Sequence, residues 1–581
     1  MVTTAQFRQA LRVGPAGDGW HKPALSAVVT LGALNLTLLG LGRLDLALYT
    51  SAGGLGALYG HGLPYRARAR TLAGVLLGTV LSTGAALTAA ALTRDAAVLV
   101  AVAAGLAALH KLLCDAARVG PPGALIITFT TASCAFVPQR LADVPPHLAL
   151  TVLGAALAWL VCMAPALVRP YGPERIATAR ALEAAARLLR AEPGRPDAAA
   201  RTALVGAVEA AWQSLALSSP ARRRALGDAP ERLLVRAEAA LAGPARPEDA
   251  ARYLDLARDL RRDRPLPSLD LTEAEATEAA EPAARRPGPR PPLRQALRPG
   301  SALLPIALRV AVGCAGAGWL SLALGVGRPY WAVVTAASVF QANSTLSWQR
   351  ALQRVLGNLL GLLLFTAALP LAHSGPVALI GLGLVCNFGA EATIARSYWL
   401  ATVFVTPLAL LMTEFAGPQP TGALVADRWL DTCVGALAGL AACLLVTNRR
   451  TAARLTRALA GAEAAGRRAS AAVRASVSAA SASPSPGSAV SGASAPEALA
   501  ARTRLAAALL ELREATDTAA GEWRRPALPH QRATDTEEQA HRLLAALLER
   551  RGRPGPPDRA PGPPDTARAL PGTAEALPGT A

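Results

Sequence analysis

The chain has 581 residues, of which 52% are hydrophobic and only 4% aromatic, and its 59 basic and 40 acidic side chains give a net charge of +19. The apolar residues are gathered into long uncharged runs, which excludes a single large soluble domain. The positive charge does not indicate a nucleic-acid partner, because no aromatic-interleaved basic stripe, zinc-finger spacing or recognition-helix pattern accompanies it.

Two sets of apolar segments predict twelve membrane spans, because about 18 to 20 uncharged residues are enough for a helix to cross the hydrocarbon core of a bilayer. The first set lies at about 23–42, 46–60, 71–93, 95–110, 119–138 and 146–168. The second set lies at about 302–325, 329–344, 351–371, 375–390, 397–413 and 428–447. The second and fourth segments of each set are short, so we expect them to be broken, tilted or shielded by neighbouring helices.

The two sets also share a residue pattern. Gly42-Arg43, Tyr49, Arg70 and the pair Gly74 and Gly78 recur as Gly327-Arg328, Tyr330, Arg354 and the pair Gly357 and Gly361. The predicted fold is therefore an all-α, polytopic membrane protein of two pseudo-symmetric six-helix transmembrane halves, related by an axis along the membrane normal.

Five regions follow from this division. Residues 1–168 and 301–447 are predicted to be the two transmembrane halves, and residues 169–300 a helical region with a Pro-rich linker. Residues 448–551 are predicted to be a second helical region, and residues 552–581, with their Pro-Gly repeats, a disordered tail.

Basic residues near the ends of the spans predict the orientation. One side of the membrane would receive Arg8, Arg12, Lys22, Arg66, Arg68, Arg70, Lys111, Arg118, Arg350, Arg354 and Arg396, and the other Arg43, Arg94, Arg140, Arg328 and Arg428. Since short cytoplasmic segments carry the excess of Lys and Arg, the richer side is predicted to be cytoplasmic. Both termini and both helical regions of this cell-membrane protein would then lie in the cytoplasm.

The sequence carries no enzyme signature. It has no G-x-x-x-x-G-K-[ST] motif, no nucleophile elbow and no metal-binding histidine pair, which predicts a protein that is not an enzyme and has no cofactor or metal. Any transport would draw on an ion gradient or on the solute's own gradient.

Polar residues inside the second half are the candidates for a site. Arg309 lies within the first span, where an arginine either snorkels to the interface or attracts an anion. Tyr330 and Trp331 fit an interfacial aromatic belt or a surface on which a planar solute stacks. Gln341 and Asn343 lie in a short span, where amides need a polar neighbour or a wet cavity.

Two further pairs have distinct predicted roles. Asp431 with Arg428 forms either a helix-end charge pair or a proton site. Gly357 and Gly361 form a small-x-x-x-small surface that favours close packing of helices.

Four spaced motifs in this half carry a resemblance. They are Tyr330-Trp331-Ala332 with Thr335, Arg354-x-x-Gly357-Asn358-x-x-Gly361, Tyr398-Trp399-Leu400-Ala401 followed by Thr406-Pro407, and Arg428-x-x-Asp431-Thr432-x-x-Gly435. This combination resembles the fusaric acid resistance-like family, also called aromatic acid exporters, although Asn358 stands where the family usually has threonine. The resemblance covers the two membrane halves, and the first half is the more degenerate copy.

The resemblance implies a secondary transporter that exports small aromatic carboxylates by alternating access between the halves. In that interpretation Arg309 attracts the carboxylate, Tyr330 and Trp331 stack on its ring, Gln341 and Asn343 orient it, and Asp431 titrates. The implied partners are the lipid bilayer and a small organic anion, with a homo-oligomer left open. An anion channel, or a membrane-anchored scaffold whose helical regions bind a partner, are the alternatives.

Overall fold

The structure is a computed structural model that describes residues 4–15, 18–191, 198–219, 226–242, 247–265, 298, 301, 303–415, 417, 419–446, 450–481, 495–522 and 529–549. Across these ranges the chain forms helices and no strand, as the sequence predicts. All but residues 265 and 298 of the predicted Pro-rich linker at 265–300, and the predicted disordered tail at 552–581, lie outside the described residues.

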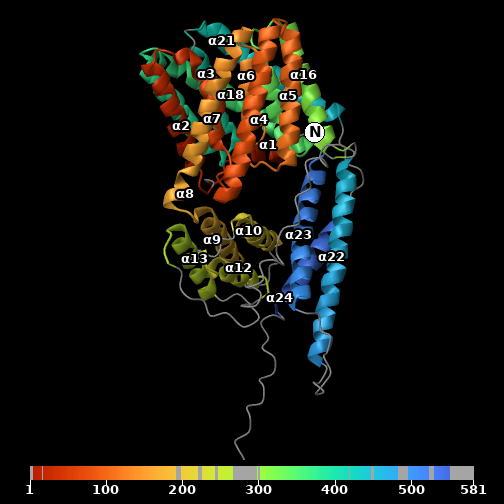
Figure 1. Cartoon of the computed structure of the whole chain (residues 1–581). Helices are drawn as coiled ribbons and strands as arrows, with labels where there is room; N and C mark the ends of the chain where they lie inside the picture. The colour runs from red at the N-terminus through yellow and green to blue at the C-terminus, as the bar shows by residue number, and fades with distance from the viewer. Residues whose placement is uncertain are drawn as a thin grey trace, which may run out of the picture.

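A bundle of long apolar helices forms the upper part of the molecule (Figure 1). By length and composition, eight helical segments of the described chain could cross a membrane. They are α2 (His21–Gly40), α4 (Tyr65–Leu92), α5 (Ala96–Ala116), the segment Leu141–Val168 that contains α7 (Val144–Met163) and α8 (Pro165–Val168), α16 (Leu303–Ala323), α18 (Ser344–Ala372), α19 (Pro376–Ile394) and α21 (Thr421–Leu445).

Shorter helices complete the bundle. They are α3 (Ala47–Gly54) with the 3-10 turn η2 (Leu55–Leu58), α6 (Leu125–Ala135), α17 (Tyr330–Val339) and α20 (Tyr398–Glu414). The short helices therefore correspond to the second and fifth predicted segments, and the prediction that the fourth is short was wrong. Helix α5 is longer than its apolar run because Lys111 and Asp115 form an i,i+4 ion pair at 3.0 Å in its last turns.

The outer surface of the bundle is apolar. Leu81 on α4 is 64% exposed, Leu363 on α18 61% and Leu437 on α21 67%. Large side chains at this exposure on helices of spanning length require a hydrocarbon environment. In contrast, α17 is almost entirely buried, so the short helix is shielded by its neighbours. We conclude that the chain is a multi-pass membrane protein.

Contacts between the first and second groups of helices are reciprocal. Helix α16, the first of the second group, packs along α5, the fourth of the first group. Helix α19, the fourth of the second group, packs along α2, the first of the first group. Each group also ends its first helix with a glycine in the left-handed region, Gly42 at φ 66° and Gly325 at φ 71°.

Glycines permit a second matching contact in each group. A Cβ at Gly154 of α7 would collide with the carbonyl oxygen of Thr50 in α3. A Cβ at Gly435 of α21 would lie 2.5 Å from the carbonyl oxygen of Ala332 in α17. The second and sixth helices of each group thus approach with backbone against backbone.

The two helical regions lie below the bundle, on the same side of it (Figure 1). The first consists of α9 (Gly172–Leu189), α10 (Ala198–Leu217), α12 (Ala229–Ala239) and α13 (Pro247–Arg261), and the second of α22 (Arg450–Ser481), α23 (Ala495–Ala520) and α24 (His530–Glu549). They share one apolar core, in which Leu204 and Leu233 lie with Leu505 and Leu544. Glu238 and Arg502 form an ion pair at 3.1 Å between the regions.

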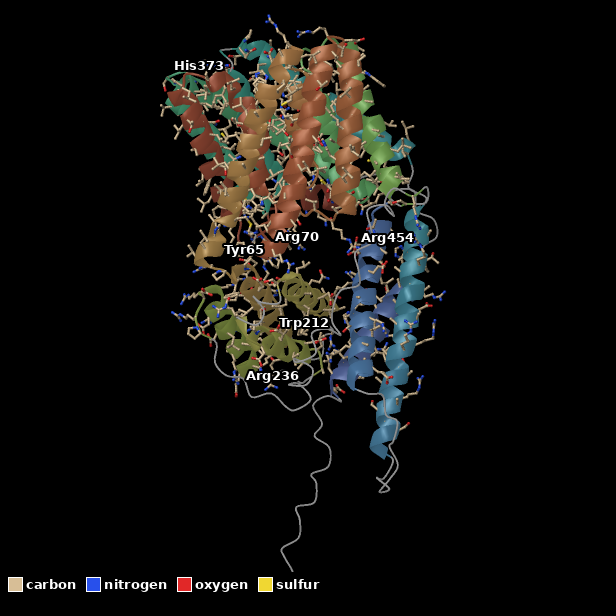
Figure 2. All side chains as sticks on the ribbon, viewed as in Figure 1. Tyr65, Arg70, Trp212, Arg236, His373 and Arg454 are labelled. Atoms are coloured by element: carbon tan, nitrogen blue, oxygen red, sulfur yellow. The ribbon has the colours of Figure 1, made fainter. Side chains whose placement is uncertain are left out.

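These regions define two ends of the bundle. The inner end, which faces them, holds Tyr65 and Arg70 at the start of α4, and the outer end holds His373 after α18 (Figure 2).

The amino-terminal segment runs across the inner end. Helix α1 (Thr4–Leu11) contacts α18, and its Ala10 carbonyl accepts a hydrogen bond from Gln353 at 2.5 Å. Asp18, which follows, forms ion pairs with Arg180 of α9 at 2.9 Å and with Arg261 of α13 at 2.8 Å. This segment therefore fastens the membrane bundle to the first helical region.

Candidate functional site

A cavity of about 580 Å³ opens between the two groups of helices at the outer end of the bundle. The first group contributes the start of α3 and the end of α6, and the second group the start of α17 and the end of α20. Six aromatic rings line it: Tyr49, Phe129, Phe136, Tyr330, Trp331 and Phe415. The residues are brought together because four helices end or begin at this level.

Tyr330 and Trp331 form one wall of this outer cavity. The half-buried Tyr330 ring lies 5.7 Å from that of Phe136 on α6 and 5.5 Å from that of Trp331. Trp331 is only 1% exposed, so its ring backs the wall while Tyr330 provides more of its surface.

Two arginines lie over the Trp331 ring. The guanidinium of Arg328 is 5.4 Å from the ring centre and that of Arg428 is 5.0 Å away. Arg328 also lies 3.4 Å from Asp427 and donates a hydrogen bond to Gln419 at 3.1 Å. Arg428 is 1% exposed, and its Nε and Nη1 have no hydrogen-bond partner among the described residues. Arg328 therefore places a positive charge on the wall of the cavity, and Arg428 places a second one behind that wall.

The opposite wall includes Tyr49 of α3. Its ring stacks on His147 of α7 with centroids 3.9 Å apart, and its hydroxyl accepts a hydrogen bond from Gln139 at 2.6 Å. Gln139 also lies 2.8 Å from the His147 Nδ1 atom. This closed set of contacts fixes the position of the Tyr49 ring.

Asp431 lies one turn after Arg428 on α21. It is 0% exposed, its Oδ1 accepts a hydrogen bond from Ser321 of α16 at 2.5 Å, and its Oδ2 has no hydrogen-bond partner in the part of the chain that the structure describes. Within the described parts of the chain no ion pair joins Asp431 to Arg428, so Trp331 rather than Asp431 is the direct neighbour of that arginine.

Gln341 and Asn343 lie at the inner end, far along α17 from the outer cavity. Gln341 donates to the Phe340 carbonyl at 2.9 Å and accepts from Arg350 at 3.4 Å. Asn343 caps α18 by accepting from the Leu346 amide at 2.9 Å, and it donates to the Asp517 carbonyl of α23 at 3.4 Å. Both amides therefore have protein partners, and the partners of Asn343 include a helical region.

Arg309 also lies toward the inner end. It is 4% exposed, and its Nε donates a hydrogen bond to the Val446 carbonyl at the end of α21. The five candidate substrate residues thus divide into an outer pair, Tyr330 and Trp331, and an inner group, Arg309, Gln341 and Asn343.

Gly357 and Gly361 face α20. A Cβ at Gly357 would lie 2.6 Å from the Thr402 Cβ, and one at Gly361 would lie 2.7 Å from the Thr406 Cβ. By contrast, a Cβ at Gly74 or Gly78 on α4 would meet nothing within 4 Å. The repeated glycine pattern therefore serves close packing in the second group only.

Some residues at these sites are not among the candidates that the sequence indicated. Arg328, Tyr49 and Ser321 are examples; the repeated Gly-Arg and Tyr pattern contained the first two, and nothing in the sequence links Ser321 to Asp431. Arg354 and Tyr398, in two separate motifs, lie together at the inner end with Arg350.

Comparison with known proteins agrees with the motifs. The family described as "Fusaric acid resistance protein-like" matches residues 315–442. The uncharacterized membrane protein YvaC of Bacillus subtilis is 32% identical over 166 residues, which cover 28% of this chain and 26% of that protein. The uncharacterized protein slr1298 of Synechocystis is 28% identical over 149 residues, which cover 26% of this chain and 20% of that protein.

The chain therefore spans about a quarter or less of the length of these curated relatives. No solved structure matches it. The matched family segment runs from within α16 to within α21 and contains Tyr330, Trp331, Arg354, Arg428 and Asp431. Residues 315–442 of this multi-pass membrane protein are thus a fusaric acid resistance protein-like segment.

Proposed function

We propose that this protein is a secondary transporter that exports small aromatic carboxylates across the cell membrane. The observation that carries the proposal is the outer cavity, which has six aromatic rings and the guanidinium of Arg328 in its lining. Rings give a planar solute stacking surfaces, and an arginine gives its carboxylate a fork of matching donors. The cavity volume of about 580 Å³ is in the range of small-molecule sites.

Tyr330, backed by Trp331, is the proposed stacking surface from one side, and Tyr49 and Phe136 are the surface from the other. Because the cavity is lined by both groups of helices, relative movement of the groups would change its size and its access to the outer side. Arg309, Gln341 and Asn343 have protein partners at the inner end, so we assign them no contact with the solute in this cavity.

The transporter would consist of two pseudo-symmetric six-helix halves, α2–α7 and α16–α21. The reciprocal contacts of α16 with α5 and of α19 with α2 support this, because a twofold pseudo-axis exchanges the members of such pairs. The matching glycine contacts between the second and sixth helices of each half support it as well.

Asp431 is the proposed proton carrier. A buried carboxyl in a membrane bundle marks an ion or proton pathway. Among the described residues, one oxygen of Asp431 accepts from a serine and the other has no hydrogen-bond partner. Arg428, which also lacks full hydrogen bonding, is close enough for a bound anion to alter the electrostatic environment of Asp431. Exchange of the anion for a proton on Asp431 would couple anion transport to the proton gradient.

The inner end is proposed to face the cytoplasm. The arginines near the inner ends of the helices outnumber those near the outer ends, and the two helical regions lie on that side (Figure 1). Export would then carry the solute from the inner end to the outer cavity.

The test uses the full chain in proteoliposomes with a panel of radiolabelled aromatic and aliphatic acids. We expect saturable benzoate flux that is driven by a pH gradient, and a decrease of at least about tenfold on Arg328→Gln, because one charge-assisted contact contributes about that much. Arg94→Gln, which removes an arginine at the outer end that does not line the cavity, is the matched control and should leave flux unchanged.

An ohmic benzoate current that does not saturate would show that the protein is an anion channel rather than a transporter. Absence of flux for every acid in the panel would overturn both.

A further inference from the structure

Arg354 of α18 is a buried arginine without adequate partners. It is 3% exposed, its Nη1 atom lies 3.4 Å from the Tyr398 hydroxyl, and its Nε has no hydrogen-bond partner among the described residues. Buried guanidinium groups are normally paired with carboxylates or saturated by carbonyl oxygens, because burying unpaired donors is costly. The described carboxylates include none within ion-pair distance of Arg354.

A second arginine lies beside it. The guanidinium of Arg350 is 3.8 Å from the centre of the Tyr398 ring, and it donates a hydrogen bond to the Gln341 side chain at 3.4 Å. Ser397, which precedes Tyr398, is 6% exposed, and its hydroxyl has no hydrogen-bond partner within the described ranges. Two cations and a hydroxyl with unused donors therefore gather between α18 and the start of α20.

The first half provides an internal comparison. Arg68 at the start of α4 is also 3% exposed, but it donates to the carbonyls of Gly60 at 3.0 Å, His61 at 2.7 Å and Cys162 at 3.2 Å. Its guanidinium thus has a protein acceptor at each nitrogen. A buried arginine is therefore saturated on α4, whereas the buried arginine on α18 keeps a free donor among the described residues.

We propose that Arg350, Arg354 and Tyr398 form an inner binding site for a carboxylate, and that the two halves are therefore functionally unequal. The carboxylate would accept hydrogen bonds from the free Nε of Arg354, from the Tyr398 hydroxyl and from Arg350. This inference rests on the proposed function: the site would receive the solute before the solute reaches the outer cavity. The first half, whose Arg68 is saturated, supplies a cavity wall but no second inner site.

Arg428 continues the positive charge toward the outer end. It lies deeper in the bundle than Arg354 and interacts electrostatically with both Arg354 and Tyr398. A monovalent anion that leaves the inner site would thus remain near a positive charge as it moves along α18 and α21 toward Trp331.

Helix α1 covers the inner site in this conformation. Gln353 and Trp399, the neighbours of Arg354 and Tyr398, donate to the carbonyls of Ala10 at 2.5 Å and Leu11 at 3.3 Å. The Arg396 carbonyl accepts from the Gly14 amide at 2.8 Å. Entry of a solute from the inner side therefore requires movement of α1.

The test measures equilibrium binding of benzoate to the full chain in nanodiscs of neutral lipid, by calorimetry, with chloride and phosphate as separate competitors. We expect Arg354→Gln to weaken inner-site binding at least about tenfold and Tyr398→Phe to weaken it severalfold, because each removes a donor to the carboxylate. Arg68→Gln is the matched control: it should lower the unfolding temperature and leave the benzoate affinity of the folded protein unchanged.

The outcomes separate this proposal from the proposed function. Equal benzoate binding by wild type, Arg354→Gln and Tyr398→Phe, together with active transport, would overturn the inner site and leave the transporter. Loss of binding in Arg354→Gln without any benzoate flux in the wild type would support the site and overturn the transporter. Binding of chloride or phosphate in preference to benzoate would overturn the assignment to a carboxylate. If Arg354→Gln does not fold, Tyr398→Phe decides.

Discussion

The guanidinium of Arg428 lies 5.0 Å from the centre of the Trp331 ring, in a contact between α21 and α17 that is fully buried. The Asp431 carboxyl, one turn away, is bonded to Ser321 instead. Replacing the ring by a smaller ring or by an aliphatic side chain therefore distinguishes the cation–ring attraction from the contribution of side-chain volume.

We expect Trp331→Leu to destabilise the protein by about 3 kcal/mol or more, because it removes both a large buried side chain and the partner of Arg428. Trp331→Phe should retain part of the cation–ring contact and therefore lose less stability than Trp331→Leu. Thermal unfolding in detergent compares the two, and equal losses would show that the ring contributes only volume.

Gly357→Ala should lower the unfolding temperature by about 5 °C or more, since the added Cβ would lie 2.6 Å from the Thr402 Cβ and against backbone of α20. The matched change is Gly74→Ala, where a Cβ meets nothing within 4 Å. For Gly74→Ala we expect a small increase of the unfolding temperature, because alanine is more favourable than glycine within a helix by about 1 kcal/mol. Similar losses at both positions would contradict the packing role of the second half's glycines.

Asp18 makes the attachment of the first helical region dependent on pH. Burial raises the pKa of this carboxyl, but hydrogen bonds from Arg261 and Arg180 outweigh burial and lower it from 3.8 to about 2. A lowered pKa in the folded state stabilises the fold above the unfolded value, and the contribution is lost as pH falls from about 4 to about 2. Hydrogen exchange of α9 and α13 should therefore accelerate over that interval.

Asp18→Asn should show faster exchange in α9 and α13 already at neutral pH and should remove the acid-dependent step. The control is Asp45→Asn, whose pair with Arg43 is exposed on both sides, at 51% and 58%, and which should change nothing. If the exchange of α9 and α13 in Asp18→Asn still accelerates as the pH falls from about 4 to about 2, another carboxyl is responsible.

Asp431→Asn should abolish flux driven by a pH gradient while leaving benzoate counterflow at equal pH, because the amide retains the hydrogen bond with Ser321 but cannot carry a proton. Flux through proteoliposomes under the two conditions separates coupling from binding. Asp115→Asn, which alters only the ion pair with Lys111 on α5, is the control. Gradient-driven flux that survives in Asp431→Asn would exclude this carboxyl as the proton carrier.

Apolar runs were enough to predict most of the membrane helices, because a spanning helix must be apolar over most of its length. They failed where packing rather than composition sets the length. Helix α6 begins only at Leu125, after the Gly120-Pro121-Pro122-Gly123 turn, although the uncharged run begins at residue 119. The predicted span at 375–390 ends before Glu391, yet α19 continues through Glu391 to Ile394, because a helix can continue past a single charge.

The candidate site was predicted less completely, because a sequence does not show which ends of which helices meet. Tyr330 and Trp331 do lie at the outer cavity, but Gln341 lies at the other end of the same short helix. Nor does a sequence show which arginine is saturated. Arg68 and Arg354 are both buried within a long helix that follows a short one, and their hydrogen-bond acceptors distinguish them.

The shared core of the two helical regions has a mechanical consequence. Leu204 and Leu233 follow the first half in the chain, and Leu505 and Leu544 follow the second, so their common packing clamps the halves together at one end. In the proposed transporter, rotation of one half against the other would pivot near this clamp, and the separation of the halves would grow with distance from it. The widest displacement would then fall at the level of Tyr49 and Tyr330, at the end of the bundle away from the clamp.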